Sequence, residues 1–212
     1  MARCAPFGSV RKLFDTVRCC SEVGYFGSAV GSQSFYQDYY QEYLSLVKSL
    51  RPIFATSGVY ITIDLGNEKF SPGGSDYLGL QQFNNQMWSD YVQAFGKADT
   101  YGFSAADAYR LDNIPNVYQG NEPAAFEVHL GAPQADANLE HACDLLSSTG
   151  RTQTFVIGEV PYVDTTTASQ LSSANAYCGN KIRFLTQYPF QPPSTFTGPT
   201  IQVGPYQTYG FF

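Results

Sequence analysis

Apolar residues recur along this chain with one of two spacings, every third or fourth position or every second position. The first spacing predicts amphipathic helices, and the second, in short β-branched runs, predicts strands. Helices are expected over residues 35–51, 77–97, 136–148 and 165–178. Strands are expected over residues 59–65, 101–109, 125–130, 152–160 and 181–188, although 101–109 could also begin a helix. The segment 113–123 is rich in proline and asparagine and is expected to be a loop.

Strand and helix alternate through the second half of the chain. This order predicts an α/β fold in which parallel strands are joined by right-handed crossovers. At 212 residues the length allows one domain, expected over residues 1–192. Residues 193–212 belong to a tail that is rich in proline and is expected to be an extended arm. Ligands of such folds bind at the carboxyl ends of the strands.

Charge and composition exclude several classes of partner. The formal charge is −6, the isoelectric point is about 4.8, and no basic cluster is longer than Arg11-Lys12, so nucleic acid is not an expected partner. No apolar run approaches the ~20 residues of a membrane span, and residues 1–8 lack the apolar core of a secretory signal. If the protein is secreted, its signal lies upstream of this sequence.

The five cysteines leave at least one without a partner inside the chain. Their spacing does not predict a zinc site, because no Cys-x-x-Cys occurs. Cys143 and Cys178 fall on the apolar faces of two consecutive predicted helices. The sequence leaves open whether these two form a disulfide or remain buried thiols.

Two glutamates carry the candidate chemistry, because each follows a predicted strand. Glu159 ends the run Phe155-Val156-Ile157-Gly158-Glu159, and Glu68 follows the strand at 59–65 in the turn Gly66-Asn67-Glu68. Two carboxylates at strand ends can act as acid and nucleophile in the cleavage of a glycosidic bond. The acid must be neutral, and burial close to a charged Glu159 is expected to raise the pKa of Glu68. In a purely structural interpretation, Glu159 leads the next helix and Glu68 lies in an ordinary turn.

The order of these elements and motifs resembles the retaining (β/α)8 glycoside hydrolases of the clan that includes cellulases, mannanases and heparanase-type glucuronidases. The resemblance covers roughly residues 50–192 and implies an incomplete or small TIM-barrel-like domain. It implies that Glu68, after Asn67, is the acid/base and that Glu159 is the nucleophile. His129 then matches a position that contacts substrate, and Tyr188 matches an aromatic platform. Glu122, in Asn121-Glu122-Pro123, is a second candidate for the acid.

The expected function is therefore retaining cleavage of a β-linked glycan by an extracellular protein, with carbohydrate as partner. No metal, cofactor or membrane is expected to take part, and the oligomeric state is left open. Two alternatives remain: a degenerate barrel that binds carbohydrate or serves as a structural extracellular protein without catalysis, and an assembly subunit whose arm docks on a neighbour.

Overall fold

The computed structural model of the chain describes residues 33–56, 62–188 and 204–211. The first described element is helix α2 (Gln33–Ala55), which includes Pro52 and runs beyond it, so the predicted end at residue 51 was wrong. Of the strand expected at 59–65, residues 59–61 lie outside the described residues. Ile63–Asp64 form the short strand β1. None of the helices in the described ranges is long and apolar enough to cross a membrane.

Every strand that the structure describes pairs in parallel with its neighbour. Strand β1 pairs with β2 (Thr100–Gly102), and β3 (Ala125–His129) pairs with β4 (Thr154–Pro161), which pairs with β5 (Ile182–Tyr188). Ala105 joins the two small sheets. Its N–H donates to the carbonyl of Glu127 at 3.0 Å, and its carbonyl accepts from the N–H of His129 at 2.9 Å. The α/β class and the parallel strands predicted from the sequence are confirmed, and the strands lie side by side in chain order.

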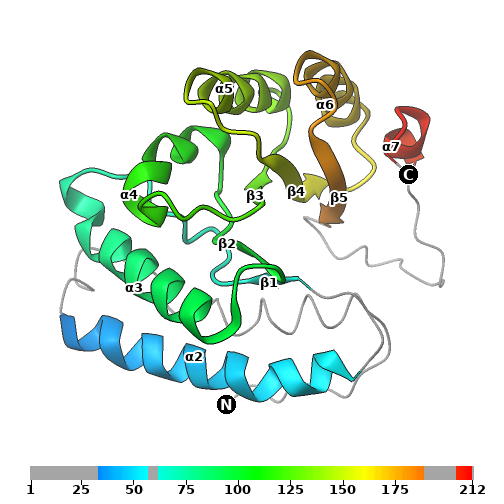
Figure 1. Cartoon of the computed structure of the whole chain (residues 1–212). Coiled ribbons are helices and arrows are strands. Elements are labelled where there is room, and N and C mark those ends of the chain that lie inside the picture. Colours follow the sequence, from blue (N-terminus) through cyan, green and yellow to red (C-terminus); the bar gives the residue numbers. More distant parts are fainter. Residues whose placement is uncertain (1–32, 57–61, 189–203, 212) are drawn as a thin grey trace.

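Helices line the outside of this arrangement in two groups (Figure 1). Helices α5 (Ala135–Ser148) and α6 (Thr165–Tyr177) pack on each other beside β3, β4 and β5, while α2 packs on α3 (Leu78–Phe95) near β1 and β2. The short 3₁₀ helix η2 (Ser75–Tyr77) leads into α3. Each strand end therefore leads into a segment that returns along the outside of the sheets, which leaves the carboxyl ends together at one edge.

The segment between β2 and β3 is helical, contrary to the loop and the long strand predicted there. It contains the 3₁₀ helix η3 (Ala108–Asn113) and helix α4 (Ile114–Tyr118). Ile114, Val117 and Tyr118 are buried on one side of this turn at helical spacing. Pro115 stands in the first turn, where its missing N–H has no partner to lose. Asn113 and Pro115 therefore start a short helix, which ends at Gln119 in the left-handed conformation.

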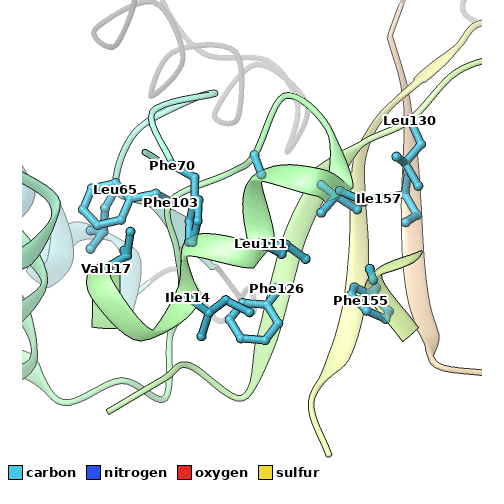
Figure 2. Packing of buried hydrophobic residues seen from close by; sticks show 14 of the residues in the cluster. Leu65, Phe70, Phe103, Leu111, Ile114, Val117, Phe126, Leu130, Phe155 and Ile157 are labelled. Carbon is cyan, nitrogen blue, oxygen red and sulfur yellow. The ribbon is translucent and has the colours of Figure 1, made fainter. Parts of the chain in front are cut away.

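One apolar cluster fills the space between the strands and the helices. Its members include Phe103, Phe126, Phe155 and Ile157, all almost fully buried (Figure 2). Tyr118 joins this cluster, with its hydroxyl accepting from the N–H of Phe103 at 3.2 Å. Gly102 makes this possible, because a Cβ at that position would lie 2.2 Å from the Tyr118 hydroxyl oxygen.

A disulfide joins Cys143 on α5 to Cys178 at the end of α6, with Cα atoms 5.7 Å apart. The sequence left open whether these two cysteines form a disulfide or remain buried thiols, and the structure shows the disulfide. In the C-terminal tail, residues 189–203 lie outside the described residues, and Gly204–Thr208 form helix α7 where an extended arm was expected. Tyr206 of α7 is buried, and its hydroxyl donates to the carbonyl of Pro161 at 2.6 Å.

Candidate active site

The structure brings together Glu68, His129 and Glu159, three residues singled out in the sequence. One ligand atom of each lies within 4.8 Å of the others. His129 ends β3 and pairs directly with Glu159 on β4, and Glu68 lies in the turn after β1. The carboxyl ends of three parallel strands thus supply the cluster, which is the edge of an α/β sheet where ligands bind.

His129 is the centre of the cluster. Its Nδ1 lies 3.0 Å from Oε1 of Glu68, a hydrogen-bond distance, and 3.7 Å from Oε1 of Glu159. Its side chain is 6% exposed, against 16% for Glu159 and 46% for Glu68. The histidine therefore touches both candidate catalytic carboxylates from a buried position, and Glu68 is the member most open to solvent.

A buried hydrogen-bond network around Asp64 fixes the turn that carries Glu68. One oxygen of Asp64 accepts from the N–H of Gly66 at 2.8 Å and from the N–H of Ser104 at 3.2 Å, and the other accepts from the Ser104 hydroxyl at 3.0 Å. The same hydroxyl oxygen accepts from the backbone N–H of Glu68 at 2.7 Å. Ser104 thus ties the backbone of Glu68 to the end of β1.

The backbone of Glu68 itself is left-handed, with φ of 55°. This conformation is uncommon for a residue with a side chain and persists only where surrounding contacts hold it. Those contacts are the Ser104 hydroxyl and the guanidinium of Arg110, which donates to the carbonyls of Glu68 at 3.3 Å and Phe70 at 3.4 Å. The turn is therefore held in one shape from both sides.

Electrostatics at Glu68 differ from what the sequence predicted. The hydrogen bond from His129 lowers the pKa of Glu68, and the charges of His129, Arg110 and Lys69 act in the same direction against the opposing effect of burial. The expected rise in the pKa of Glu68 was wrong, because that expectation counted Glu159 and burial and left out a donor at hydrogen-bond distance. Glu68 is thus charged at neutral pH in the free protein.

Asp64 shows the opposite shift. Burial raises its pKa, while the hydrogen bonds from Gly66 and Ser104 and the charge of His129 partly counter the effect. Sequence reasoning missed this residue. The available signal was its place as the last residue of β1, one turn before Glu68.

A third glutamate, Glu127, also faces His129 and was missed. Its Oε1 lies 4.0 Å from Nε2 of His129, and its side chain is 13% exposed. The two residues are separated by Val128 on β3, so their side chains lie on the same face of the strand. The signal in the sequence was this alternation, Glu127-Val128-His129, in an otherwise apolar strand.

The other candidate residues lie outside the cluster. Tyr188 ends β5 and pairs with Pro161, two residues beyond Glu159 on β4. Asn67 precedes Glu68 in the turn, and its buried side-chain oxygen has no hydrogen-bond partner in the described parts of the chain. Glu122 precedes β3 at the opposite edge and accepts from Arg151 at 3.0 Å, so it does not meet the other two glutamates.

Two carboxylates and an imidazole are also a donor set that metal ions accept. In this structure, however, His129 and Glu68 use their facing atoms in a hydrogen bond with each other. Within the described ranges no other group of three such side chains lies close enough together. The three side chains therefore offer a metal ion three ligand atoms, and the hydrogen bond between His129 and Glu68 is the contact that the structure shows among them.

Comparison with models of known protein families gives no match, and neither the curated proteins nor the solved structures contain a significant match to this chain. The chemistry of Glu68, His129 and Glu159 therefore carries the functional argument.

Proposed function

We propose that this protein is a retaining glycoside hydrolase that cleaves a β-linked glycan with Glu68 and Glu159. The observation that carries the proposal is the distance between the two glutamates, each of which places a carboxyl oxygen within 4.8 Å of the other's. Retaining enzymes hold their two carboxyl groups about 5 to 5.5 Å apart, whereas inverting enzymes leave roughly 6.5 to 9.5 Å for a water molecule. The close approach favours a covalent intermediate.

In the proposed reaction, a carboxylate oxygen of Glu159 attacks the anomeric carbon and forms an ester bond. The bond from that carbon to the glycosidic oxygen breaks, and the oxygen takes a proton from Glu68. In the second half, water attacks the anomeric carbon, its proton passes to Glu68, and the ester bond to Glu159 breaks. The product keeps the configuration of the substrate.

The lowered pKa of Glu68 gives His129 a part in this cycle. Glu68 in the free structure is charged, which is the form required of the base in the second half. For the first half Glu68 must carry a proton. Glu159 offers His129 a second acceptor, 3.7 Å from the same Nδ1. We propose that the hydrogen bond moves from Glu68 to Glu159 when sugar binds, so that Glu159 stays charged as the nucleophile. Glu68, which is 46% exposed, then loses the donor that lowers its pKa and takes a proton from solvent to become the acid.

The fold proposed for this chemistry is a (β/α) barrel or an arc of one. The strands run parallel and lie in chain order, as neighbouring barrel strands do. A second observation supports strong curvature. Tyr101 of β2 and Phe184 of β5 belong to different sheets, which Ala105 links through β3, and they bring their ring centroids to 5.9 Å. If the strands of both sheets lay flat in chain order, those rings would be about 14 Å apart, three strand spacings away.

The disulfide favours an extracellular location, since such bonds persist in oxidising compartments. The alternative function, a carbohydrate-binding or structural extracellular protein without catalysis, is consistent with the same location. The two differ in one measurable respect, which is turnover. Binding of a glycan without cleavage would favour the alternative.

The test is hydrolysis of a panel of aryl β-glycosides and β-linked oligosaccharides, with product configuration followed by proton NMR. We expect retention, and we expect E159A to lose at least a thousandfold in kcat and to regain turnover with azide, which replaces the missing nucleophile. E68A is expected to lose activity chiefly on substrates with poor leaving groups, because these need the acid most. E42Q, which alters an exposed carboxylate on α2, is the matched control.

Unchanged turnover in E159A, or inversion at the anomeric carbon, would refute the assignment. The assays are repeated after treatment with a chelator. If turnover then falls and returns with a divalent cation, a metal mechanism replaces the proposed one.

A further inference from the structure

We propose that Tyr206 of the C-terminal helix α7 is a positioning residue, which fixes the loop between β4 and α6 and thereby holds the end of the strand that carries Glu159. The inference rests on the proposed function for its catalytic consequence. Its structural content concerns the loop at residues 162–164 and can be tested without any activity.

The first observation is how deeply α7 is anchored by one side chain. Tyr206 is 0% exposed although α7 has only five residues, whereas Tyr209, directly after this helix, is 38% exposed. The Tyr206 hydroxyl donates to the carbonyl of Pro161, the last residue of β4, at 2.6 Å. Helix α7 packs beside α6 (Figure 1). The C-terminal segment is therefore docked at the carboxyl end of β4, two residues beyond Glu159.

The same hydroxyl reaches the first turn of α6. Burial and the charge of Asp164 raise the pKa of Tyr206, while hydrogen bonds from the Thr167 side chain and the backbone of Asp164 act in the opposite direction. The hydroxyl therefore keeps its proton and serves as the donor to Pro161. Asp164 is the N-cap of α6 and accepts from the N–H of Thr167 at 2.7 Å. Tyr206 thus joins the end of β4 to the start of α6.

The second observation is a strained residue in the loop that Tyr206 spans. Val163 has a φ of 53°, which is an outlier for a β-branched side chain and persists only where neighbours hold it. Its N–H donates to Oε1 of Gln187 on β5 at 2.8 Å. On its other side lies the start of α7, since a Cβ on Gly204 would be 3.1 Å from Cγ1 of Val163. Gln187 and α7 therefore hold this backbone from two sides.

The third observation is a path from Tyr206 to the candidate site. The Thr167 hydroxyl oxygen accepts from the backbone N–H of Ala132, which lies three residues after His129, at 2.8 Å. Closer to the site, the N–H of Leu130 donates to the carbonyl of Glu159 at 3.0 Å. The chain segments that follow β3 and β4 are therefore joined twice, and Tyr206 contacts the outer of these two connections.

These contacts give Tyr206 an effect on the reaction although it touches neither glutamate. Without the ring, the carbonyl of Pro161 loses its donor and Val163 loses the anchored helix beside it. The end of β4 is then free to shift, and with it the carboxylate of Glu159. Attack on an anomeric carbon needs the reacting atoms about 3 to 3.5 Å apart and aligned, so a small displacement lowers kcat more than it weakens binding.

The decisive experiment follows hydrogen exchange of the backbone amides of Val163 and Thr167 by NMR. In Y206A we expect both amides to exchange at least about tenfold faster, because the loop opens locally. Y206F keeps the ring and loses the hydroxyl, so it should lie between Y206A and the unaltered protein. Y209A is the matched control on the same segment and should leave both rates unchanged.

The amide of Ile157, in the centre of β4, separates a local effect from a global one. Its exchange rate should be the same in Y206A, Y206F and the unaltered protein. Equal rates at Val163 and Thr167 in Y206A and the unaltered protein would overturn the proposal. Parallel acceleration at Ile157 would also overturn it, because Tyr206 would then stabilise the whole fold instead of fixing one loop.

Kinetics separate positioning from mere structure when each variant is assayed well below its melting temperature. In Y206A we expect kcat on aryl β-glycosides to fall about tenfold, with KM changed less, and Y206F should restore part of the loss. Local acceleration of exchange without glycoside turnover in the unaltered protein would refute the proposed function and leave the structural role of Tyr206 in place. Turnover with an unchanged kcat in Y206A would leave the proposed function and overturn the positioning role.

Discussion

From β3 to β5 the chain is held by apolar packing under α5 and α6, whereas the turn that follows β1 is held by hydrogen bonds to one buried carboxylate. Phe126, Phe155 and Ile157 are almost fully buried between strands of five to eight residues. In contrast, β1 has two residues and β2 has three. The Ser104 hydroxyl donates to Asp64 at the end of β1 and accepts from the backbone N–H of Glu68, and these two bonds hold the turn after β1. The candidate site takes His129 and Glu159 from the first region and Glu68 from the second.

The two glutamates proposed to react are placed by different forces. Glu159 is fixed by strand register, since it pairs with His129 across β3 and β4. Glu68 is fixed by three hydrogen bonds in a turn whose backbone is left-handed. Changes in the apolar region should therefore act on stability, and changes in the polar region should act on catalysis more than on stability.

The largest expected effect on stability is the removal of a buried ring in the apolar region. F155A deletes a side chain that is fully buried and should lower the free energy of unfolding by about 3 to 5 kcal/mol. The activity of the remaining folded protein should change little. Urea unfolding followed by fluorescence measures the loss. F184A, at a ring that is 37% exposed, is the control and should cost clearly less.

Removal of the disulfide should give the next largest loss in the free energy of unfolding. It closes a loop with a sequence separation of 35, so its loss in C143A/C178A should cost about 3 to 4 kcal/mol by the loop-entropy estimate. A reducing agent should destabilise the unaltered protein by a similar amount and leave the double variant unchanged. If reduction has no effect on the urea midpoint of the unaltered protein, the bond contributes nothing to stability.

A smaller effect on stability, with a larger one on catalysis, is expected in the polar region. S104A removes the hydroxyl that joins Asp64 to the backbone N–H of Glu68, and it should cost about 1 to 2 kcal/mol. Because Glu68 then loses a contact that holds its strained backbone, kcat should fall tenfold or more. S49A, at an exposed hydroxyl on α2, is the control for both measurements. Equal kcat in S104A and S49A would mean that the Ser104 hydroxyl does not place Glu68 for catalysis.

The same division explains which parts the sequence could predict. The helices at 136–148 and 165–178 and the strands around Glu159 and His129 were predicted within a few residues, because apolar periodicity reports burial against a sheet. The sequence did not predict the bounds of β1 and β2, because a strand of two or three residues has no period. It also missed the helices η3 and α4, because the buried residues Ile114, Val117 and Tyr118 span less than two helical turns.

In the candidate site, strand-end position was enough to nominate Glu68, His129 and Glu159. It could not reveal the network that sets their charges. Asp64, Ser104 and Glu127 act through contacts with residues 40, 36 and 2 positions away, and only the fold brings the distant ones together. The error in the direction of the Glu68 pKa has this origin.

The smallest expected effect on stability comes from the charge of Asp64 and is visible in how the free energy of unfolding depends on pH. Its raised pKa means that the folded protein keeps this proton at a pH where the unfolded chain has lost it, so its contribution to stability falls as pH rises from about 4 upward through the folded pKa. Glu68 contributes with the opposite sign, because its lowered pKa stabilises the fold above about 4.5 and this contribution is lost as pH falls through the folded pKa.

D64N isolates the Asp64 contribution, since Glu68 is present in both proteins. The amide oxygen can still accept from Gly66 and Ser104, while the cost of burying a charge is removed. Urea midpoints measured from pH 4 to pH 8 should therefore show D64N gaining on the unaltered protein as pH rises. A difference that shrinks or reverses with rising pH would mean that Asp64 is held charged by its neighbours. The polar region would then be stabilised by an ion pair with His129 in addition to neutral hydrogen bonds, and the turn of Glu68 would share the charge of the active site.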